Sequence, residues 1–278
     1  MKFRVFGISA LAGVVLAAGL VANSGVAQAS GDTNPGHYLA LGDSLAFGDG
    51  ASSPEHNGYV PRVARAFNSL NPAFEPYTNL SVKGETSTSF IAGGQLASAL
   101  ASITDTATDI ELVTLDIGGN DLLALLKDGP CTTDPQGPVC ALLVAGTLQQ
   151  FGNNFGTIVG TIAYGLGFDP GSETFLVMTY YNPWDGTGSQ YEAIVDMALF
   201  GLDGTVDCAA ATGNPYNAGM NDIITCVGQQ FGAGVVDVYP AFDGRAAELT
   251  HIGENNIHPN TRGYEVIAEE FIDVLRAG

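Results

Sequence analysis

The sequence predicts an α/β fold, a single doubly wound and mainly parallel five-stranded sheet with helices on both faces. Short apolar runs alternate along the chain with longer segments of helical periodicity, which is the order of βα units in a parallel sheet. Several of the apolar runs break into glycine-containing turns, as expected at strand ends. No internal repeat and no long linker divides residues 30–278, so we expect one domain there.

The expected strands are short, and a covered parallel sheet makes such strands apolar on both faces. The runs occur at residues 37–41, 77–81, 110–115, 174–179 and 235–238.

The expected helices fill the intervals between these runs. Residues 59–70 place Tyr59, Val63, Phe67 and Leu70 on one face, and Pro61 is tolerated in the first turn. Further helices are expected at residues 94–101, 141–165, 191–202 and 217–231. In the last helix, Asn260 is placed to act as the N-cap, and one face carries Tyr264, Ile267, Phe271 and Leu275.

The first 29 residues have the pattern of a signal peptide. Lys2 and Arg4 precede an apolar run over residues 8–21, and Ala27-Gln28-Ala29 supplies the small residues of a cleavage site. An uncleaved membrane anchor is the alternative, but the run is shorter than the roughly 20 residues that a span needs. We therefore expect a secreted, extracellular protein with no membrane span after cleavage.

Four cysteines fit an oxidising compartment. An even number in an exported chain favours two disulfides, and proximity in sequence favours Cys131–Cys140 and Cys208–Cys226 among the three possible pairings. Zinc is the competing interpretation, but neither a Cys-x-x-Cys nor a His-x-x-x-His spacing occurs. We expect no metal.

The chain is strongly acidic. It has 9 Lys and Arg against 29 Asp and Glu, a formal net charge of −20. Such a surface repels nucleic acid and anionic lipid headgroups, so neither is an expected partner. A monomer is expected.

Four segments carry residues with possible chemistry. Ser44 follows the first strand in Gly42-Asp43-Ser44-Leu45, Gly84 follows the second, and Asn120 follows the third in Gly118-Gly119-Asn120-Asp121. The carboxyl ends of parallel strands share one rim, where open α/β sheets bind ligands. His258 lies immediately before the last helix and supplies a histidine, a residue type that can act as a base.

These segments resemble the blocks of the SGNH (GDSL-type) hydrolase family, including His258-Pro259-Asn260 with Gly263-Tyr264. The blocks arrive in the family's order and span nearly all of residues 30–278. The resemblance implies a flavodoxin-like fold and the chemistry of secreted bacterial esterases and lipases. Ser44 is then the nucleophile and His258 its base. The backbone N–H groups of Ser44 and Gly84 and the side-chain amide of Asn120 form the oxyanion hole.

One position departs from the family pattern. An aspartate usually stands three residues before the histidine, and here that position is Asn255. An amide oxygen can orient the imidazole but cannot stabilise its protonated form by charge. Three explanations remain open: a Ser–His dyad oriented by Asn255 or a backbone carbonyl, a carboxylate from Glu254 or Asp243, or a chain that has lost activity.

The expected function is that of a serine ester hydrolase of the carboxylesterase or lipase type, which needs no cofactor and acts on small-molecule or lipid esters through an acyl-serine intermediate. A carbohydrate acetyl esterase is the alternative enzyme, and a secreted binding protein with weakened catalysis is the alternative from another class. Tyr180, Tyr181 and Trp184 either line an acyl pocket or belong to the core. The insertion over residues 131–169 is either a pocket wall or lid, or additional core.

Overall fold

The computed structural model describes residues 36–70, 77–167, 175–201, 206, 208 and 218–277. These residues belong to one compact unit, Asn34–Gly278. The signal peptide expected over residues 1–29 lies outside the described residues.

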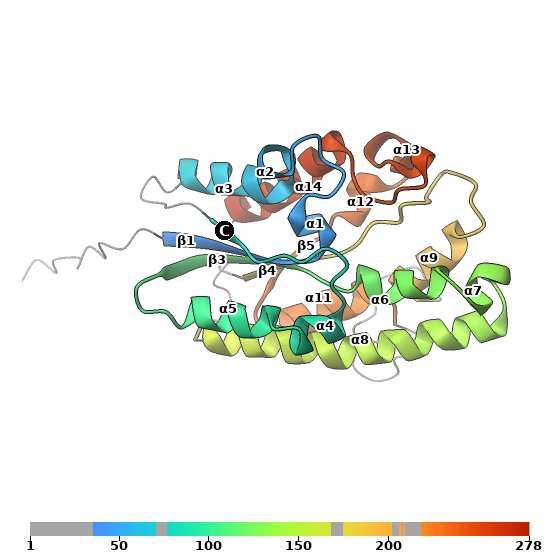
Figure 1. Ribbon diagram of the computed structural model, residues 1–278, viewed down its shortest axis with the longest axis horizontal. Helices are drawn as coiled ribbons and strands as arrows, with labels where there is room; N and C mark the ends of the chain where they lie inside the picture. The colour runs from blue at the N-terminus through green and yellow to red at the C-terminus, as the bar shows by residue number, and fades with distance from the viewer. Residues whose placement is uncertain are drawn as a thin grey trace, which may run out of the picture. The chain divides into compact units, whose positions relative to one another are not determined.

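The described strands form one parallel sheet, as predicted, and every pairing in it is parallel. The sheet has five strands in the order β2-β1-β3-β4-β5 (Figure 1). Their bounds are β1 (Gly36–Gly42), β2 (Thr78–Asn79), β3 (Asp109–Asp116), β4 (Phe175–Met178) and β5 (Gly234–Val236).

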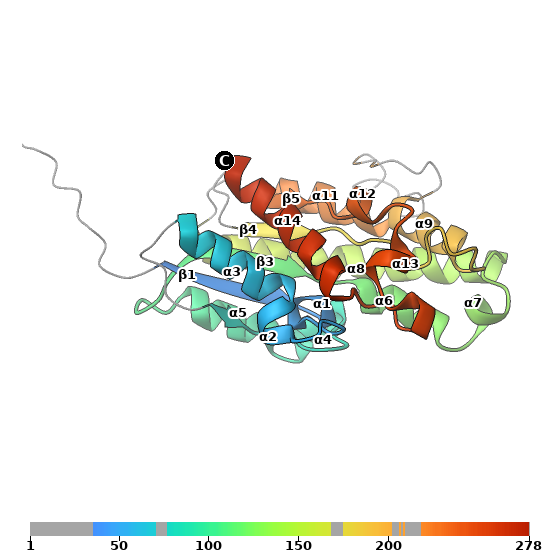
Figure 2. The same cartoon turned by 90° about the horizontal axis from the view of Figure 1, so that it is seen from above.

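Helices cover both faces of this sheet. The pair α3 (Tyr59–Leu70) and α14 (Thr261–Ala277) lies on one face, and α5 (Gln95–Ile103), α8 (Pro138–Gly165) and α11 (Met220–Gln230) lie on the other (Figures 1 and 2). The shorter helical elements are α1 (Ser44–Phe47), α2 (Pro54–Asn57), α4 (Ser87–Ala92), α6 (Gly119–Leu123), η1 (Ala124–Leu126), α7 (Pro130–Thr133), α9 (Glu192–Phe200), α12 (Tyr239–Phe242), α13 (Ala246–Leu249) and η2 (Ile252–Glu254).

The helix predictions hold best where the apolar periodicity is long. The helix predicted over residues 59–70 has the same bounds in the structure. Asn260 caps α14 as expected, because its Oδ1 accepts the backbone N–H groups of Arg262 at 2.9 Å and Gly263 at 3.0 Å. Tyr264 on that helix is fully buried.

Two predictions near the sheet edge were less accurate. The second strand was expected over residues 77–81, but only Thr78 and Asn79 pair with β1. Beyond them, the N–H groups of Leu80 and Val82 still donate to the carbonyls of Ala40 and Gly42 at 2.9 Å and 3.0 Å, while the N–H of Ser81 donates to the side chain of Asn79 at 3.0 Å. The helix α4 was not predicted. Its apolar content is low, and it begins at a capping box formed by Thr86 and Ser89.

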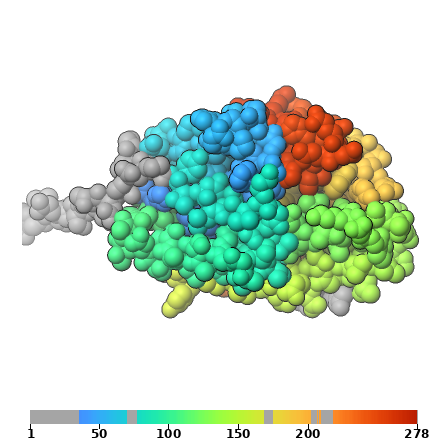
Figure 3. Space-filling model, viewed as in Figure 1, coloured from blue at the N-terminus to red at the C-terminus, as the bar shows by residue number. Residues whose placement is uncertain are grey.

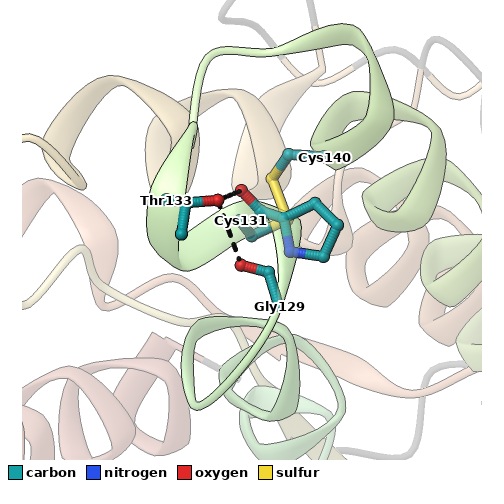
Figure 4. The surroundings of a disulfide bond; sticks show 5 residues. Gly129, Cys131, Thr133 and Cys140 are labelled. Atoms are coloured by element: carbon teal, nitrogen blue, oxygen red, sulfur yellow. Dashed lines mark hydrogen bonds between the residues drawn. A yellow bond between two sulfur atoms is a disulfide. The ribbon is translucent and has the colours of Figure 1, made fainter.

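Both expected disulfides are present, Cys131–Cys140 and Cys208–Cys226. The first links α7 to the first turn of α8, and in Figure 4 the hydroxyl of Thr133 points at the carbonyl of Gly129 beside it. The helix predicted over residues 141–165 starts three residues earlier, because Pro138 is favourable at a helix N-terminus. Among the described helices, none combines the length and hydropathy required to cross a membrane.

Candidate active site

Ser44 is the first residue of α1, immediately after β1. Asp43 caps this helix, because its Oδ1 accepts the backbone N–H of Leu45 at 2.9 Å. Gly42 makes the turn between strand and helix with a φ of 142°. A Cβ on Gly42 would lie 2.4 Å from the carbonyl oxygen of Asp116, so only glycine fits at this close approach of β1 and β3.

Asp116 holds the same turn from the neighbouring strand. It ends β3 level with Gly42, and its Oδ2 accepts the backbone N–H of Asp43 at 3.1 Å and that of Ala46 at 3.4 Å. Its Oδ1 accepts the hydroxyl of Tyr59. Asp116 therefore bonds backbone on both sides of Ser44 and fixes the conformation that presents the serine.

His258 reaches Ser44 from the segment between η2 and α14. Its Nε2 lies 2.8 Å from the Ser44 Oγ. The backbone carbonyl of His258 accepts the N–H of His251 at 3.0 Å, and the hydroxyl of Tyr181 donates to the carbonyl of Ile257 at 2.9 Å. These two bonds fix the backbone at Ile257 and His258 and so hold the imidazole in place.

The side chain of Asn256 determines the tautomer of His258. Its Oδ1 lies 3.1 Å from the backbone N of His258 and 2.6 Å from Nδ1. A backbone N–H can only donate, so the atom facing it is the amide oxygen, and Nδ1 must carry a hydrogen to bond the same oxygen. Nε2 is then unprotonated and accepts the hydroxyl hydrogen of Ser44.

Sequence reasoning selected Asn255 for this role, but among the described residues the hydrogen bond to Nδ1 of His258 comes from Asn256. Asn255 has a φ of 56° and ends the short helix η2, where an asparagine tolerates the left-handed conformation. The side chain that orients His258 belongs to the next residue, because Asn256 forms an Asx turn with the backbone two residues ahead. The sequence has two adjacent asparagines here, so an Asx turn by Asn256 could have been proposed from the sequence. The family spacing pointed to Asn255 instead.

The two alternative carboxylates also lie elsewhere. The side chain of Glu254 is 80% exposed, and its Oε2 lies 3.9 Å from Nδ1 of His251 rather than beside His258. Asp243 is exposed and follows α12. Within the described residues, the carboxylate closest to the imidazole is that of Asp49, whose Oδ2 lies 3.8 Å from Nε2 of His258. Sequence reasoning did not single out Asp49.

The structure places Asn120 and the Gly84 turn next to Ser44. The amide Nδ2 of Asn120 donates to the carbonyl of Glu85 at 2.9 Å and lies 3.4 Å from Oδ2 of Asp43. The Gly84 turn is joined to the end of β1, since the N–H of Val82 donates to the carbonyl of Gly42 at 3.0 Å. Gly84 has a φ of 77°, and no described atom lies within 4 Å of a Cβ built on it.

Burial raises the pKa of both carboxyl groups beneath the serine. Asp43 and Asp116 are 2% and 0% exposed, and desolvation raises the pKa of each, with the charge of Asp43 adding to the effect on Asp116. The hydroxyl of Tyr180 donates to Oδ2 of Asp43 at 2.9 Å. Both shifts favour the neutral form of a carboxyl group in these apolar surroundings.

Burial has the opposite effect on His258, because its charged form is the cation. Desolvation lowers the pKa of His258, the nearby charge of Asp49 raises it, and Lys83 and His251 lower it. The imidazole is therefore neutral, and able to accept a proton, over a wider range of pH than an exposed histidine.

A pocket of about 80 Å³ opens beside Ser44 and His258. Its lining is mainly apolar and comes from α6, η1, α7, α8 and α9 together with the segment after β4. Tyr180, Tyr181 and Trp184 are among the lining residues, as are both cysteines of the first disulfide. The insertion over residues 131–169 thus contributes a wall of this pocket. Other apolar residues of the insertion, such as Phe151 and Phe155, are buried in the core, whereas Leu142 and Tyr164 are exposed.

Segments distant in sequence adjoin one another on one face of the molecule. In the space-filling view the blue and cyan segments from the first third of the chain adjoin the red C-terminal segment and the green segment that follows β3 (Figure 3).

No group of three or more His, Cys, Asp or Glu side chains within the described ranges is arranged to hold a metal ion.

Comparisons with known proteins identify the family of the chain and structures of similar fold. The model of the GDSL-like lipase/acylhydrolase family matches residues 40–266. A comparison with curated proteins found no significant match.

Three solved structures illustrate the similarity of fold. The lipase Lip_vut3 from a goat rumen metagenome is 19% identical with a TM-score of 0.57, covering 87% of this chain and 96% of its own. The α/β hydrolase LAE5 from the metagenome of Lake Arreo is 20% identical with a TM-score of 0.52, covering 87% and 95%. The acetylxylan esterase Axe2 from Geobacillus stearothermophilus is 14% identical with a TM-score of 0.54, covering 87% and 94%.

Proposed function

The chain belongs to the GDSL-like lipase/acylhydrolase family and is therefore an ester-bond hydrolase, and we propose that it cleaves acyl esters through an acyl-enzyme intermediate on Ser44. The observation that carries the proposal is the 2.8 Å contact between the Ser44 Oγ and Nε2 of His258. With the hydrogen of the imidazole on Nδ1, Nε2 is free to take the serine proton.

In the first half of the reaction, the Ser44 Oγ attacks the ester carbonyl while Nε2 of His258 accepts its proton. The tetrahedral intermediate collapses when the C–O bond to the alcohol breaks, and the imidazolium returns the proton to the leaving oxygen. Water then attacks the acyl-serine with His258 again as base. The acid leaves, and Ser44 recovers its proton.

The negative charge that develops on the carbonyl oxygen requires donors already in place. The N–H groups of Ser44 and Gly84 make no hydrogen bond to an acceptor in the described part of the chain, so both are available. The amide of Asn120 donates one hydrogen to the carbonyl of Glu85 at 2.9 Å, and its second hydrogen makes only a long contact of 3.4 Å to Oδ2 of Asp43. In the proposal this second hydrogen turns to the oxyanion and is the third donor. Removal of one such donor typically costs about 10²–10³ in kcat.

The pocket supports an acyl group longer than acetyl as the preferred substrate. Its walls contain Leu122, Leu125 and Leu126 together with Val144 and Ile194, which favour hydrocarbon over the hydroxyl groups of a sugar. Burial of each methylene is worth about 0.8 kcal/mol. A lipid or fatty-acyl ester is thus favoured over the acetylated carbohydrate that the similar fold of Axe2 also accommodates.

We extend the proposal to the location of the enzyme. Two disulfides are characteristic of proteins from oxidising compartments, and the predicted signal sequence ends at Ala29. Sequencing the N-terminus of the protein recovered from the culture medium tests this. Retention in the cell with Met1 intact would contradict it.

The test of the catalytic proposal uses p-nitrophenyl esters of increasing acyl length and a fluorophosphonate probe. Wild-type protein should react with the probe and hydrolyse hexanoyl or octanoyl esters faster than acetyl esters. Ser44→Ala should lose at least about 10⁴ of kcat and all labelling, with an unchanged circular dichroism spectrum. Equal turnover by Ser44→Ala would refute the assignment. A wild-type protein that does not label would favour a binding protein with the same fold, and a strict preference for acetyl esters would favour the carbohydrate esterase.

A further inference from the structure

His258 lacks the usual source of negative charge. In a Ser-His-Asp triad a carboxylate on the Nδ1 side stabilises the imidazolium that forms when the serine loses its proton. Here Nδ1 faces the neutral amide of Asn256 at 2.6 Å. The amide holds the ring and its tautomer but contributes no charge, so the imidazolium requires another partner.

We propose that Asp49 is the charge partner of the catalytic histidine, and that Lys83 limits the strength of this interaction through an ion pair with the same carboxylate oxygen. The proposal rests on the catalytic role of Ser44 and His258 set out above. Asp49 is a positioning residue, because it acts through His258 and need not touch the substrate.

The distances support an interaction through charge. Oδ2 of Asp49 lies 3.8 Å from Nε2 of His258, beyond hydrogen-bond length, while the Ser44 Oγ occupies the hydrogen-bonding position at 2.8 Å. The carboxylate therefore does not displace the serine. It lies within the range over which an opposite charge favours the protonated imidazole.

The backbone of Asp49 is fixed on both sides. Its N–H donates to the carbonyl of Ser44 at 2.9 Å, and its carbonyl accepts the hydroxyl of Tyr264 at 2.6 Å. The next residue, Gly50, lies so close to the histidine segment that a Cβ there would be 2.6 Å from the carbonyl oxygen of Pro259. The carboxylate thus occupies its place before the reaction begins, as electrostatic stabilisation requires.

Lys83 carries the positive charge that counteracts the carboxylate of Asp49. Its Nζ lies 2.8 Å from the same Oδ2 and 5.2 Å from the centroid of the Phe47 ring. Lys83 also precedes Gly84, so the ion pair ties the turn that carries a proposed oxyanion donor to the turn that carries Ser44. Side-chain exposure is 31% for Asp49 and 49% for Lys83, so water weakens the pair without removing it.

The other ionisable groups around His258 are held by separate contacts. His251 faces the ring from the preceding turn, and its Nε2 bonds the carbonyl of Gly50 at 2.9 Å. Glu254 lies beside His251, and Asp43 is buried beneath the serine with Tyr180. The hydroxyls of Tyr181 and Tyr264 donate to backbone carbonyls. These groups are common to every variant below, so their effects cancel in the comparison.

The experiment compares two substitutions that break one ion pair but change the charge near His258 in opposite directions. Asp49→Asn should lower the pKa of His258, and Lys83→Met should raise it, each by about one pH unit. The pKa is followed by NMR of the histidine ring, assigned with His258→Gln. This readout does not depend on ester hydrolysis, so it remains decisive even if the proposed function fails.

Activity supplies the second readout. The plateau of kcat/KM in Asp49→Asn should fall about tenfold, the equivalent of one pH unit of lost interaction. Its acidic limb should move to lower pH, and that of Lys83→Met to higher pH. Asp49→Glu keeps the charge and should recover most of the loss. Glu265→Gln, which removes the exposed partner of Arg62, serves as the matched ion-pair control and should change neither quantity.

Shifts of the same sign in both variants would overturn the proposal, because a purely structural role for the ion pair predicts equal effects from breaking it at either end. An unchanged His258 pKa in both variants would overturn it as well. If Asp49→Asn does not fold, the Lys83→Met titration decides alone.

Discussion

The backbone N–H of Asp43 donates to the carboxylate oxygen Oδ2 of Asp116 across 3.1 Å, directly beneath the serine turn. Both side chains are buried, and both are bonded to tyrosines, Asp116 to Tyr59 and Asp43 to Tyr180. Two carboxylates in such surroundings cannot both ionise cheaply. The support of the nucleophile is therefore a pair of buried carboxyl groups whose pKa values are both raised.

This pair predicts a specific dependence of stability on pH. Burial raises the pKa of both carboxyl groups, so the folded state binds more protons than the unfolded state above pH about 4. The contribution of this pair to the free energy of unfolding should be largest below that pH and should fall as pH rises toward the folded pKa values, by up to about 1.4 kcal/mol per unit for one proton. Asp116→Asn keeps the shape and removes one acid, so its decline between pH 4 and pH 8 should be shallower.

Urea unfolding of both proteins at several pH values measures this difference. Glu248→Gln is a suitable control, because that carboxylate lies in an exposed ion pair with Arg245. Parallel curves for wild type and Asp116→Asn would show that the pair holds no extra proton in the folded state.

A second prediction concerns the amide beside His258. Asn256→Asp replaces the neutral Oδ1, 2.6 Å from Nδ1, with a carboxylate. A carboxylate at this distance should raise the pKa of His258 by 1–3 units, move the acidic limb of kcat/KM to higher pH and increase the plateau rate. The pH–rate profile with a p-nitrophenyl ester measures all three.

The neighbouring asparagine provides the matched control for that change. Asn255→Asp adds the same charge one residue earlier, at a position with left-handed backbone that aspartate also tolerates. Because the hydrogen bond to Nδ1 comes from Asn256, the Asn255 variant should retain the wild-type profile within about half a pH unit. If the two substitutions have equal effects, Asn256 is not the specific partner of Nδ1.

A third prediction concerns the length of the acyl group. Leu126 lines the pocket and is half-buried, so Leu126→Trp should shorten the space available to the chain. The ratio of kcat/KM for octanoyl over acetyl esters should fall at least tenfold, the value of about two buried methylenes. Leu142 on α8 is 65% exposed and does not line the pocket, so Leu142→Trp is the control. A selectivity ratio unchanged in Leu126→Trp would move acyl binding away from this pocket.

The fold was largely predictable because strand and helix periodicity is strong in this chain. Continuous apolar runs marked β1, β3 and β4, and the alternation of elements implied the parallel topology. The edge strand β2 and the helix α4 were harder, because β2 has only two residues and α4 begins at the side-chain hydrogen bonds of the Thr86–Ser89 capping box. Periodicity carries no information about bonds of this kind.

The site was predictable where residues stand in several motifs that occur in a recognisable order. Ser44, His258 and Asn120 stand in motifs whose order implied their meeting, and the structure places them together. Asn256 and Asp49 were missed for a different reason. Their roles depend on side-chain direction and on the approach of two loops distant in sequence, as the close contact of Gly50 with the histidine segment shows. Such approaches are visible only in three dimensions.

The disulfide between Cys131 and Cys140 should stabilise the protein and shape its pocket at once. It closes a short loop with a sequence separation of 9, and both cysteines line the pocket. Replacing both with alanine should cost about 2–4 kcal/mol of unfolding free energy and weaken the preference for longer acyl esters, because the wall loses its anchor. The Cys208–Cys226 pair spans 18 residues and does not line the pocket. Its double alanine variant should lose comparable stability while its chain-length preference stays at the wild-type value. Urea unfolding and the ester series separate the two effects, and equal selectivity in both variants would exclude the first disulfide as a determinant of the pocket.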